Sequence, residues 1–175
     1  MRTFETKDLI IRPSQWSDLD CFYTWERDEK VTEFFSINDD QSWETLAREY
    51  IHHDESPSQM QFTILMKETN APVGRIILGD IEEKWKLEIW RIYIANTELR
   101  GKGYGRQAMT AIMHFCFEEL EMKRVYLDHY TDNPASFLYQ SLGFKYEGIL
   151  RDNCRKNGIL RDVHLMAMLK NEYFA

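Results

Sequence analysis

The chain has 175 residues, of which 43% are hydrophobic and 14% aromatic, so it is long and apolar enough to form a sizeable core. Its formal charge of −7 argues against a general binder of nucleic acids or of anionic membranes. Cys21, Cys116 and Cys154 are odd in number and contain no CxxC pair. They indicate free thiols in a reducing compartment, not a disulfide framework or a zinc site.

The N-terminal stretch MRTFETKDLIIRP has no apolar signal core, and no run of roughly 18 apolar residues occurs anywhere in the chain. We therefore expect a cytoplasmic protein. The composition contains no metal-ligand cluster with usable spacing, so no metal site is expected.

The first third of the chain predicts a short strand followed by two helices. Residues 8–13 suit a strand that stops at Pro13. Residues 17–29 predict a helix with Ser17 as its N-cap, and residues 39–53 predict a second helix with apolar side chains at helical spacing.

The remainder predicts strands at 61–66, 73–81 and 87–95, then a helix at 106–120. A strand at 124–130, a helix at 134–144 and a closing pair of strands complete the order. This order predicts an α+β fold with a mixed, mostly antiparallel central sheet of about seven strands flanked by about four helices. One domain over residues 1–175 is expected.

The turn TELRGKGYGRQAM, residues 97–109, carries glycines at alternate positions between a strand and a helix. Glycine permits positive φ and close approach of a ligand, and a helix N-terminus favours an anion. The dinucleotide fingerprint fails because Arg106 stands where its third glycine belongs, and the P-loop fails because Gly103 follows Lys102. A glycine-rich turn without a ligand stays an alternative at this point.

What fits is R-x-x-G-x-G at residues 100–105, which closely resembles the pyrophosphate-binding loop of the GNAT superfamily of N-acetyltransferases. The later stretch NPASFLYQSLGF resembles that family's A-x-x-x-Y-x-x-x-G-F pattern, with Tyr139 at the tyrosine. The early stretch LIIRPSQWSDLD resembles the branch that acetylates ribosomal-protein N-termini and polyamines. The resemblance covers nearly the whole chain.

The resemblance implies acetyl-CoA as the donor and direct transfer of the acetyl group to an amine. The expected pyrophosphate contacts are Arg100, Gly101, Lys102, Gly103, Tyr104, Gly105 and Arg106. The expected contacts to the rest of the cofactor are Ile92, Tyr93, Ile94, Asp132, Asn133 and Ser136. Relatives often carry Asn at the place of Asp132, which cannot donate an amide proton.

Two residues are expected to be catalytic. By resemblance, Tyr139 protonates the leaving thiolate, since a phenol of pKa about 10 is protonated at neutral pH; the alternative is that it only packs against the cofactor. Glu88 is the candidate base, because strand alternation predicts Glu88, Trp90, Ile92 and Ile94 on one face. The alternative for Glu88 is a solvent-facing or ion-paired carboxylate.

The acceptor pocket is expected to take Glu33, Phe35 and Asp39 from the loop between the first two helices. The alternative is that the acids at 39 and 40 only start the second helix. The predicted function is an N-acetyltransferase for the primary amine of a small molecule, with polyamines among the candidates. The alternatives are acetylation of a protein or peptide N-terminus, and a non-catalytic acyl-CoA-binding module; a homodimer stays open.

Overall fold

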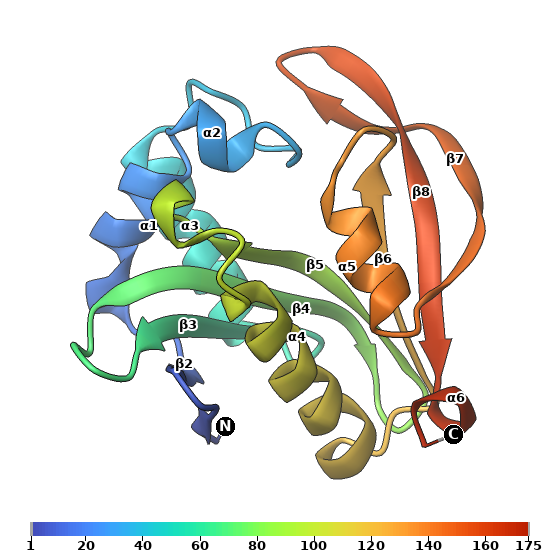
Figure 1. Ribbon diagram of the computed structural model, residues 1–175. Coiled ribbons are helices and arrows are strands. Elements are labelled where there is room, and N and C mark those ends of the chain that lie inside the picture. Colours follow the sequence, from blue (N-terminus) through green and yellow to red (C-terminus); the bar gives the residue numbers. More distant parts are fainter. Residues whose placement is uncertain (1, 175) are drawn as a thin grey trace.

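A mixed sheet of eight strands runs through the computed structural model, which describes residues 2–174 (Figure 1). The order across the sheet is β1-β2-β3-β4-β5-β6-β8-β7. The strands are β1 Phe4–Glu5, β2 Leu9–Pro13, β3 Met60–Met66, β4 Pro72–Glu82, β5 Lys86–Ile94, β6 Arg124–Tyr130, β7 Lys145–Lys156 and β8 Ile159–Leu169.

Helices lie on both faces of this sheet (Figure 1). They are α1 Leu19–Trp25, α2 Glu29–Thr32, α3 Trp43–Glu55, α4 Tyr104–His114, α5 Ala135–Ser141 and α6 Lys170–Tyr173. Short 3-10 turns precede α1 and α4, and a π-helical turn at Phe115–Glu119 extends α4. None of the helices among the described residues has the length and hydrophobicity that crossing a membrane requires.

The main core lies between the sheet and α4. Ala108 and Ile112 of α4 are fully buried there against strand residues such as Ile64 and Ile76. A second cluster forms where Leu19 of α1 and its neighbours meet α3 on the opposite face. Period-2 alternation explains both layers, because Ile76 faces α4 while the adjacent Arg75 lies over the Phe22 ring of α1.

The expected α+β class and mixed sheet are confirmed, with more elements than the sequence predicts. The extra strand, β1, has only two residues, and the extra helices α2 and α6 have four residues each. Segments this short show no periodicity, so their positions depend on tertiary contacts.

Both early helices begin later than expected. Ser17 is not an N-cap, because a 3-10 turn occupies Trp16–Asp18 and the Asp18 carboxylate accepts from the Gln15 N–H at 2.8 Å. The second helix begins at Trp43 with Ser42 as its N-cap, whose hydroxyl accepts from the Thr45 N–H at 3.2 Å. The acids at 39 and 40 therefore precede the helix and do not start it.

One strand pairing determines the shape of the site. β5 runs parallel to β6, and the two are paired only from Lys86 to Glu88, opposite Arg124 to Tyr126. Beyond these residues the two strands separate, while β5 stays paired to β4 on its other side as far as Ile94. The sheet therefore opens into a V at the carboxyl end of β5.

Candidate active site

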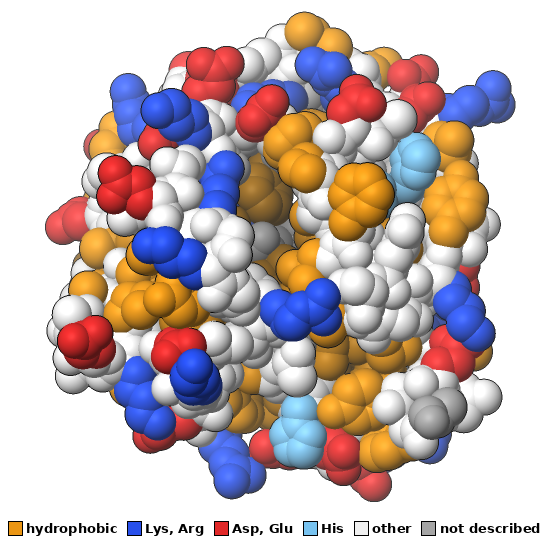
Figure 2. All heavy atoms as spheres, in the orientation of Figure 1, with side chains coloured by type: hydrophobic (Ala, Val, Ile, Leu, Met, Phe, Trp, Pro, Cys, Tyr) orange, Lys and Arg blue, Asp and Glu red, His pale blue; other side chains and the backbone are white. Residues whose placement is uncertain are grey.

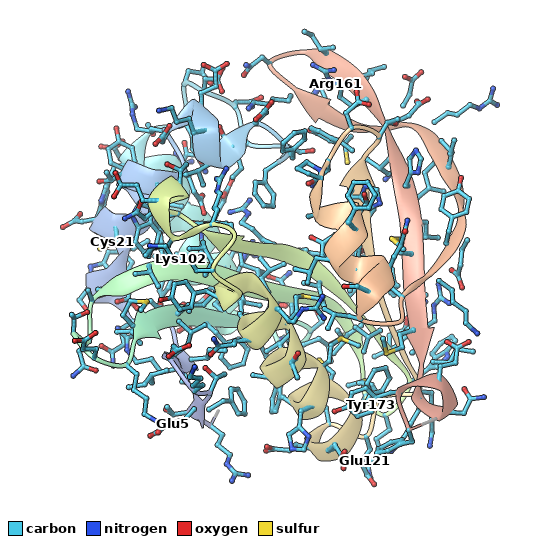
Figure 3. The ribbon with its side chains drawn as sticks, viewed as in Figure 1. Glu5, Cys21, Lys102, Glu121, Arg161 and Tyr173 are labelled. Carbon is cyan, nitrogen blue, oxygen red and sulfur yellow. The ribbon has the colours of Figure 1, made fainter. Side chains whose placement is uncertain are left out.

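The glycine turn before α4 adopts the backbone that the sequence predicts. Gly101 and Gly103 have φ of 74° and 86°, in the left-handed region that favours glycine. A Cβ added to either would meet nothing within 4 Å, so the requirement is conformational and not steric. The turn delivers the chain into α4 at Tyr104 (Figure 3 labels Lys102 within it).

The start of α4 has the properties of an anion site. The Gln107 N–H donates to the Gly103 carbonyl at 3.0 Å, so the amides before Gln107 are those a helix leaves without intrahelical partners. Two guanidinium groups flank the start of the helix. Arg100 donates to the Lys30 carbonyl at 2.7 Å, and Arg106 donates to the Ser141 hydroxyl at 2.6 Å.

A cavity of about 560 Å³, here called the donor groove, opens beside this helix start. Its walls come from α2, from the end of β5, from the first turns of α4 and from residues 133–139. Figure 2 shows a hollow on this face, with hydrophobic side chains inside it and Lys or Arg side chains near its rim. Ile92, Tyr93 and Ile94 line the groove from β5, whose edge toward β6 is unpaired past Glu88 in the described residues.

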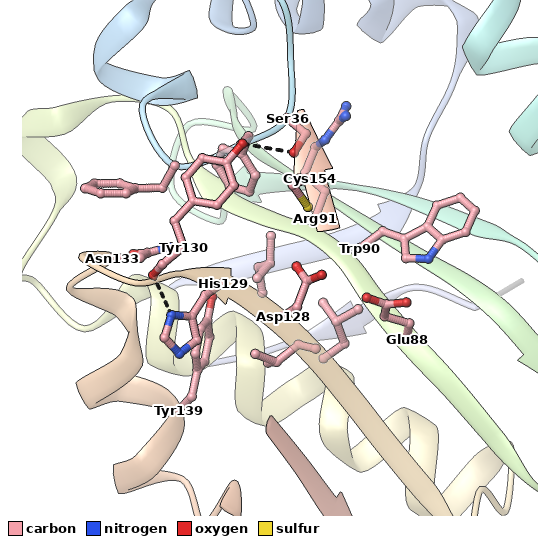
Figure 4. Close-up of a pocket in the computed structure, with 15 residues that line it drawn as sticks. Ser36, Glu88, Trp90, Arg91, Asp128, His129, Tyr130, Asn133, Tyr139 and Cys154 are labelled. Atoms are coloured by element: carbon pink, nitrogen blue, oxygen red, sulfur yellow. Dashed lines mark hydrogen bonds between the residues drawn. The ribbon is translucent and has the colours of Figure 1, made fainter. Parts of the chain in front are cut away.

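A smaller cavity of about 210 Å³, here called the acceptor pocket, fills the V between β5 and β6 (Figure 4). Its walls come from the segment after α2, from both splayed strands, from Asn133 and Tyr139, and from Cys154 near the end of β7. The donor groove and the acceptor pocket share five lining residues: Phe34, Phe35, Ile92, Asn133 and Tyr139. The two cavities are therefore adjoining parts of one site.

The profile of the Acetyltransferase (GNAT) domain matches residues 8–145, which is most of the chain. The chain belongs to the GNAT acetyltransferase family.

Two relatives of this GNAT acetyltransferase align over almost their full length. The uncharacterized N-acetyltransferase p20 of Bacillus licheniformis is 29% identical over 99% of both chains. The spermidine N(1)-acetyltransferase of Vibrio cholerae is 25% identical over 94% of this chain and 95% of that protein. The crystal structure of a spermidine N-acetyltransferase from Vibrio cholerae in complex with CoA and spermine superposes with a TM-score of 0.85 at 24% identity, covering 97% of this chain and 100% of that one, and so supports the fold.

Glu88 of this GNAT acetyltransferase lines the acceptor pocket. Burial raises its pKa to about 7, and the neighbouring carboxylates of Asp128 and Asp80 add to the shift. Burial also raises the pKa of Asp128. Glu88 and Asp128 come from the two splayed strands and face the same pocket in Figure 4, so their charges disfavour each other.

Tyr139 lies at the junction of the two cavities and is only 8% exposed. Burial, with the Asp128 carboxylate second, raises its pKa to about 12. The phenol therefore stays protonated at neutral pH and is available as a hydrogen-bond or proton donor.

His129 is a pocket residue that the sequence did not indicate. It is 6% exposed, and its Nδ1 lies 2.8 Å from the Tyr130 carbonyl oxygen (Figure 4). Since a carbonyl oxygen can only accept, this contact requires a proton on Nδ1. The His129 ring lies 6.0 Å from the Tyr139 ring and 5.3 Å from that of His164.

The expected donor residues gather at the groove, although not all line it. Arg100, Gly101, Gly105 and Asn133 line the groove. The remaining predicted donor residues are adjacent in the chain but are not among its lining residues: Lys102, Gly103, Tyr104, Arg106, Asp132 and Ser136.

Only one of the three expected acceptor residues lines the acceptor pocket. Phe35 does so, whereas Glu33 and Asp39 are exposed and line neither cavity. The Asp39 carboxylate instead accepts from the Asn157 side-chain amide at 2.6 Å and lies 3.5 Å from the Lys156 ammonium. A contact between such distant residues cannot be read from the local sequence.

The prediction that Glu88, Trp90, Ile92 and Ile94 share one face of β5 is wrong for Ile92 and Ile94. A register shift opposite Ile77 and Leu78 leaves Trp90 as an extra residue in β5. Glu88 and Trp90 stay on one face, where the Trp90 ring covers Gly79, but Ile92 and Ile94 pack against the core on the other. The bulge reverses the alternation after Trp90.

The pocket residues that the sequence did not indicate are Phe34, Ser36, Ile89, Trp90, Arg91, Leu127, Asp128, His129, Tyr130 and Cys154. Asp128 and His129 give a weak signal, because they interrupt an otherwise apolar strand. Within residues 2–174, no group of three or more His, Cys, Asp or Glu side chains is arranged to hold a metal ion.

Proposed function

We propose that this GNAT acetyltransferase moves the acetyl group of acetyl-CoA directly to the primary amine of a small molecule, with polyamines as the first acceptor class to test. The observation that carries the proposal is the shared lining of the two cavities at Tyr139 and Phe35. A donor in the groove and an amine in the pocket would meet at that junction.

The residues present fit acetyl-CoA. The amides at the start of α4, with Arg100 and Arg106 beside them, suit a pyrophosphate. The unpaired edge of β5 at residues 92–94 suits the amides of the pantetheine arm, and a backbone N–H there suits the thioester oxygen as it gains charge. Asn133, which lines the opposite wall, remains a proposed contact, as do Asp132 and Ser136, which are close to it in the chain but do not line the groove.

Two side chains supply the proton transfers in this proposal. Glu88, acting directly or through water, accepts the proton that an ammonium must lose before its nitrogen can attack. The nitrogen bonds to the acetyl carbon, the carbon–sulfur bond breaks, and the sulfur leaves with the electron pair. The nitrogen releases its second proton in this step, which balances the proton that the sulfur gains. Tyr139 donates a proton or a hydrogen bond to that sulfur.

The pocket's chemistry supports a cationic acceptor. Glu88 and Asp128 supply carboxylates, and Phe35, Trp90 and Tyr130 supply aromatic surface. Spermidine N-acetyltransferases of about one-quarter identity supply the polyamine candidate. A protein N-terminus as acceptor and a non-catalytic acyl-CoA-binding module remain the rival proposals.

The test begins with calorimetric titration of acetyl-CoA, with free CoA alongside. Saturable one-to-one binding is expected, and a folded protein that binds neither would overturn the enzyme proposal. A kinetic screen of spermidine, spermine, simple monoamines and N-terminal peptides then assigns the acceptor. Turnover on peptides alone would identify a protein N-terminus, not a small amine, as the acceptor. Binding of acetyl-CoA without turnover on any amine would favour the non-catalytic acyl-CoA-binding module.

A further inference from the structure

Residues 32–39 pass beside the acceptor pocket and are tied to the turn between β7 and β8. The Lys156 ammonium donates to the Thr32 carbonyl at 2.7 Å and to the Thr32 hydroxyl at 3.3 Å. The Asn157 backbone N–H donates to the Asn38 side-chain oxygen at 2.9 Å. The Asn157 side chain makes two hydrogen bonds to Asp39. Its amide oxygen accepts from the Asp39 backbone N–H at 3.1 Å, and its amide nitrogen donates to the Asp39 carboxylate at 2.6 Å. These contacts are here called the bridge.

The bridge joins parts of the chain that are 118 to 124 residues apart. The segment after α2 and the β7–β8 hairpin lie on opposite sides of the V in the sheet (Figure 1). Lys156 is well enclosed, with only 13% of its side chain exposed, and Asn157 has φ of 50°, as a tight turn requires. The turn is therefore shaped to present its polar groups to residues 32–39.

What the bridge holds is one wall of the acceptor pocket. Phe34, Phe35 and Ser36 lie between its anchor points and line that pocket. The Ser36 hydroxyl lies 2.9 Å from the Tyr130 hydroxyl, which fixes the same segment to β6 (Figure 4). A shift of the segment would move both phenylalanine rings, and these rings also line the donor groove.

We propose that Lys156 and Asn157 are positioning residues that hold residues 32–39 over the acceptor pocket and so limit the size of the amine that enters. Neither side chain lines the pocket, so each acts through the segment it holds. The inference rests on the proposed function only for the identity of the acceptor. The bridge itself is a feature of the free protein.

The decisive variant is Asn157→Asp, which places a second carboxylate against Asp39. We expect the acceptor KM to rise by about tenfold, while the dissociation constant for acetyl-CoA stays within about twofold. The kcat/KM for bulky amines should rise relative to that for slim amines, an effect that a general loss of stability would not produce. The double variant Asn157→Asp with Asp39→Asn restores one amide and one carboxylate, so it should recover most of the wild-type KM and size preference.

Arg155→Met is the matched control, because Arg155 is an exposed neighbour in the same hairpin and lines neither cavity. Hydrogen exchange of the amides of residues 32–39 tests the bridge without turnover, and Asn157→Asp should accelerate it by about tenfold. Unchanged exchange, or unchanged size preference in an active enzyme, would overturn the inference. A wild-type protein that acetylates no amine would instead overturn the proposed function, and exchange alone would then decide the bridge.

Discussion

Tyr139 is buried at the junction of the two cavities, where the hydroxyl rather than the ring should matter for chemistry. Tyr139→Phe keeps the ring contact with Phe144, whose centroid lies 6.1 Å away. We expect turnover to fall by about 100-fold, because a positioned proton donor typically contributes that much or more. Affinity for CoA should change little.

The measurement for Tyr139→Phe is kcat beside calorimetric CoA binding. A wild-type kcat in Tyr139→Phe would show that the hydroxyl takes no part in the reaction and that Tyr139 only packs against its neighbours. Loss of CoA binding would show that the hydroxyl orients the cofactor instead.

Glu88 makes the pH dependence of the reaction predictable. Its raised pKa means that the carboxylate form predominates only above about pH 7. If this carboxylate is the base, kcat/KM should rise with pH through about 7. Glu88→Gln should abolish that rise. Glu83→Gln, on an exposed turn, is the control, and a profile unchanged by Glu88→Gln would assign the base elsewhere.

At the scale of elements, Glu26 joins the end of α1 to two strands. Its carboxylate accepts from Arg75 of β4 at 2.8 Å, from Arg91 of β5 at 3.0 Å and from the Tyr93 hydroxyl at 3.0 Å. Burial opposes its charge, but Arg91 and Arg75 hold the pKa of Glu26 below the ordinary value of 4.5.

Glu26→Gln should lower the free energy of unfolding by about 3–5 kcal/mol, because it leaves the buried Arg75 and the partly buried Arg91 without their counter-charge. Denaturant titration at neutral pH measures the loss. A depressed carboxyl pKa contributes stability above pH 4.5 that is lost as pH falls through the folded value, so the wild type should weaken below pH 4.5 more than the variant does. Equal stability of the two proteins at neutral pH would contradict this account.

Much of the element pattern could be predicted from the sequence. Short runs rich in apolar and β-branched residues predicted β3, β4 and β6 within about two residues, and the R-x-x-G-x-G spacing predicted the turn before α4. These signals are local, since the periodicity or φ requirement lies within the segment itself. That residues 1–175 form one domain stays a prediction.

The acceptor side could not be predicted in the same way. Asp128 and His129 enter the pocket only because β5 and β6 separate beyond Glu88. The faces of β5 depend on the bulge at Trp90, which forms opposite a different strand. Asp39 is held by a turn more than a hundred residues away. Each outcome depends on contacts that only the folded chain creates.

At the scale of the whole molecule, the V divides the sheet into two parts that are paired with each other over three residues of β5. Acetyl-CoA in the donor groove would contact β5 and α4 on one side and residues 133–139 on the other. We expect it to stabilise the fold by about 2.7 kcal/mol at 100 times its dissociation constant, which thermal unfolding would detect.

Gly103→Ala is the comparison for this stabilisation, because a side chain is strained at its φ of 86° and the helix start would shift. The variant should lose most of the ligand-induced increase in Tm. An equal ligand-induced increase in Tm in both proteins would show that the glycine turn does not contribute to cofactor binding.

The outer strand β7 bears on how the protein behaves at high concentration. An unpaired sheet edge is a template on which other chains can add strands and aggregate. Two register shifts interrupt β7, and charged side chains recur along it at Lys145, Glu147, Arg151, Asp152 and Arg155. An irregular, charged edge is a poor template, so we expect β7 to disfavour fibril-like association despite its exposed Tyr146 and Ile149.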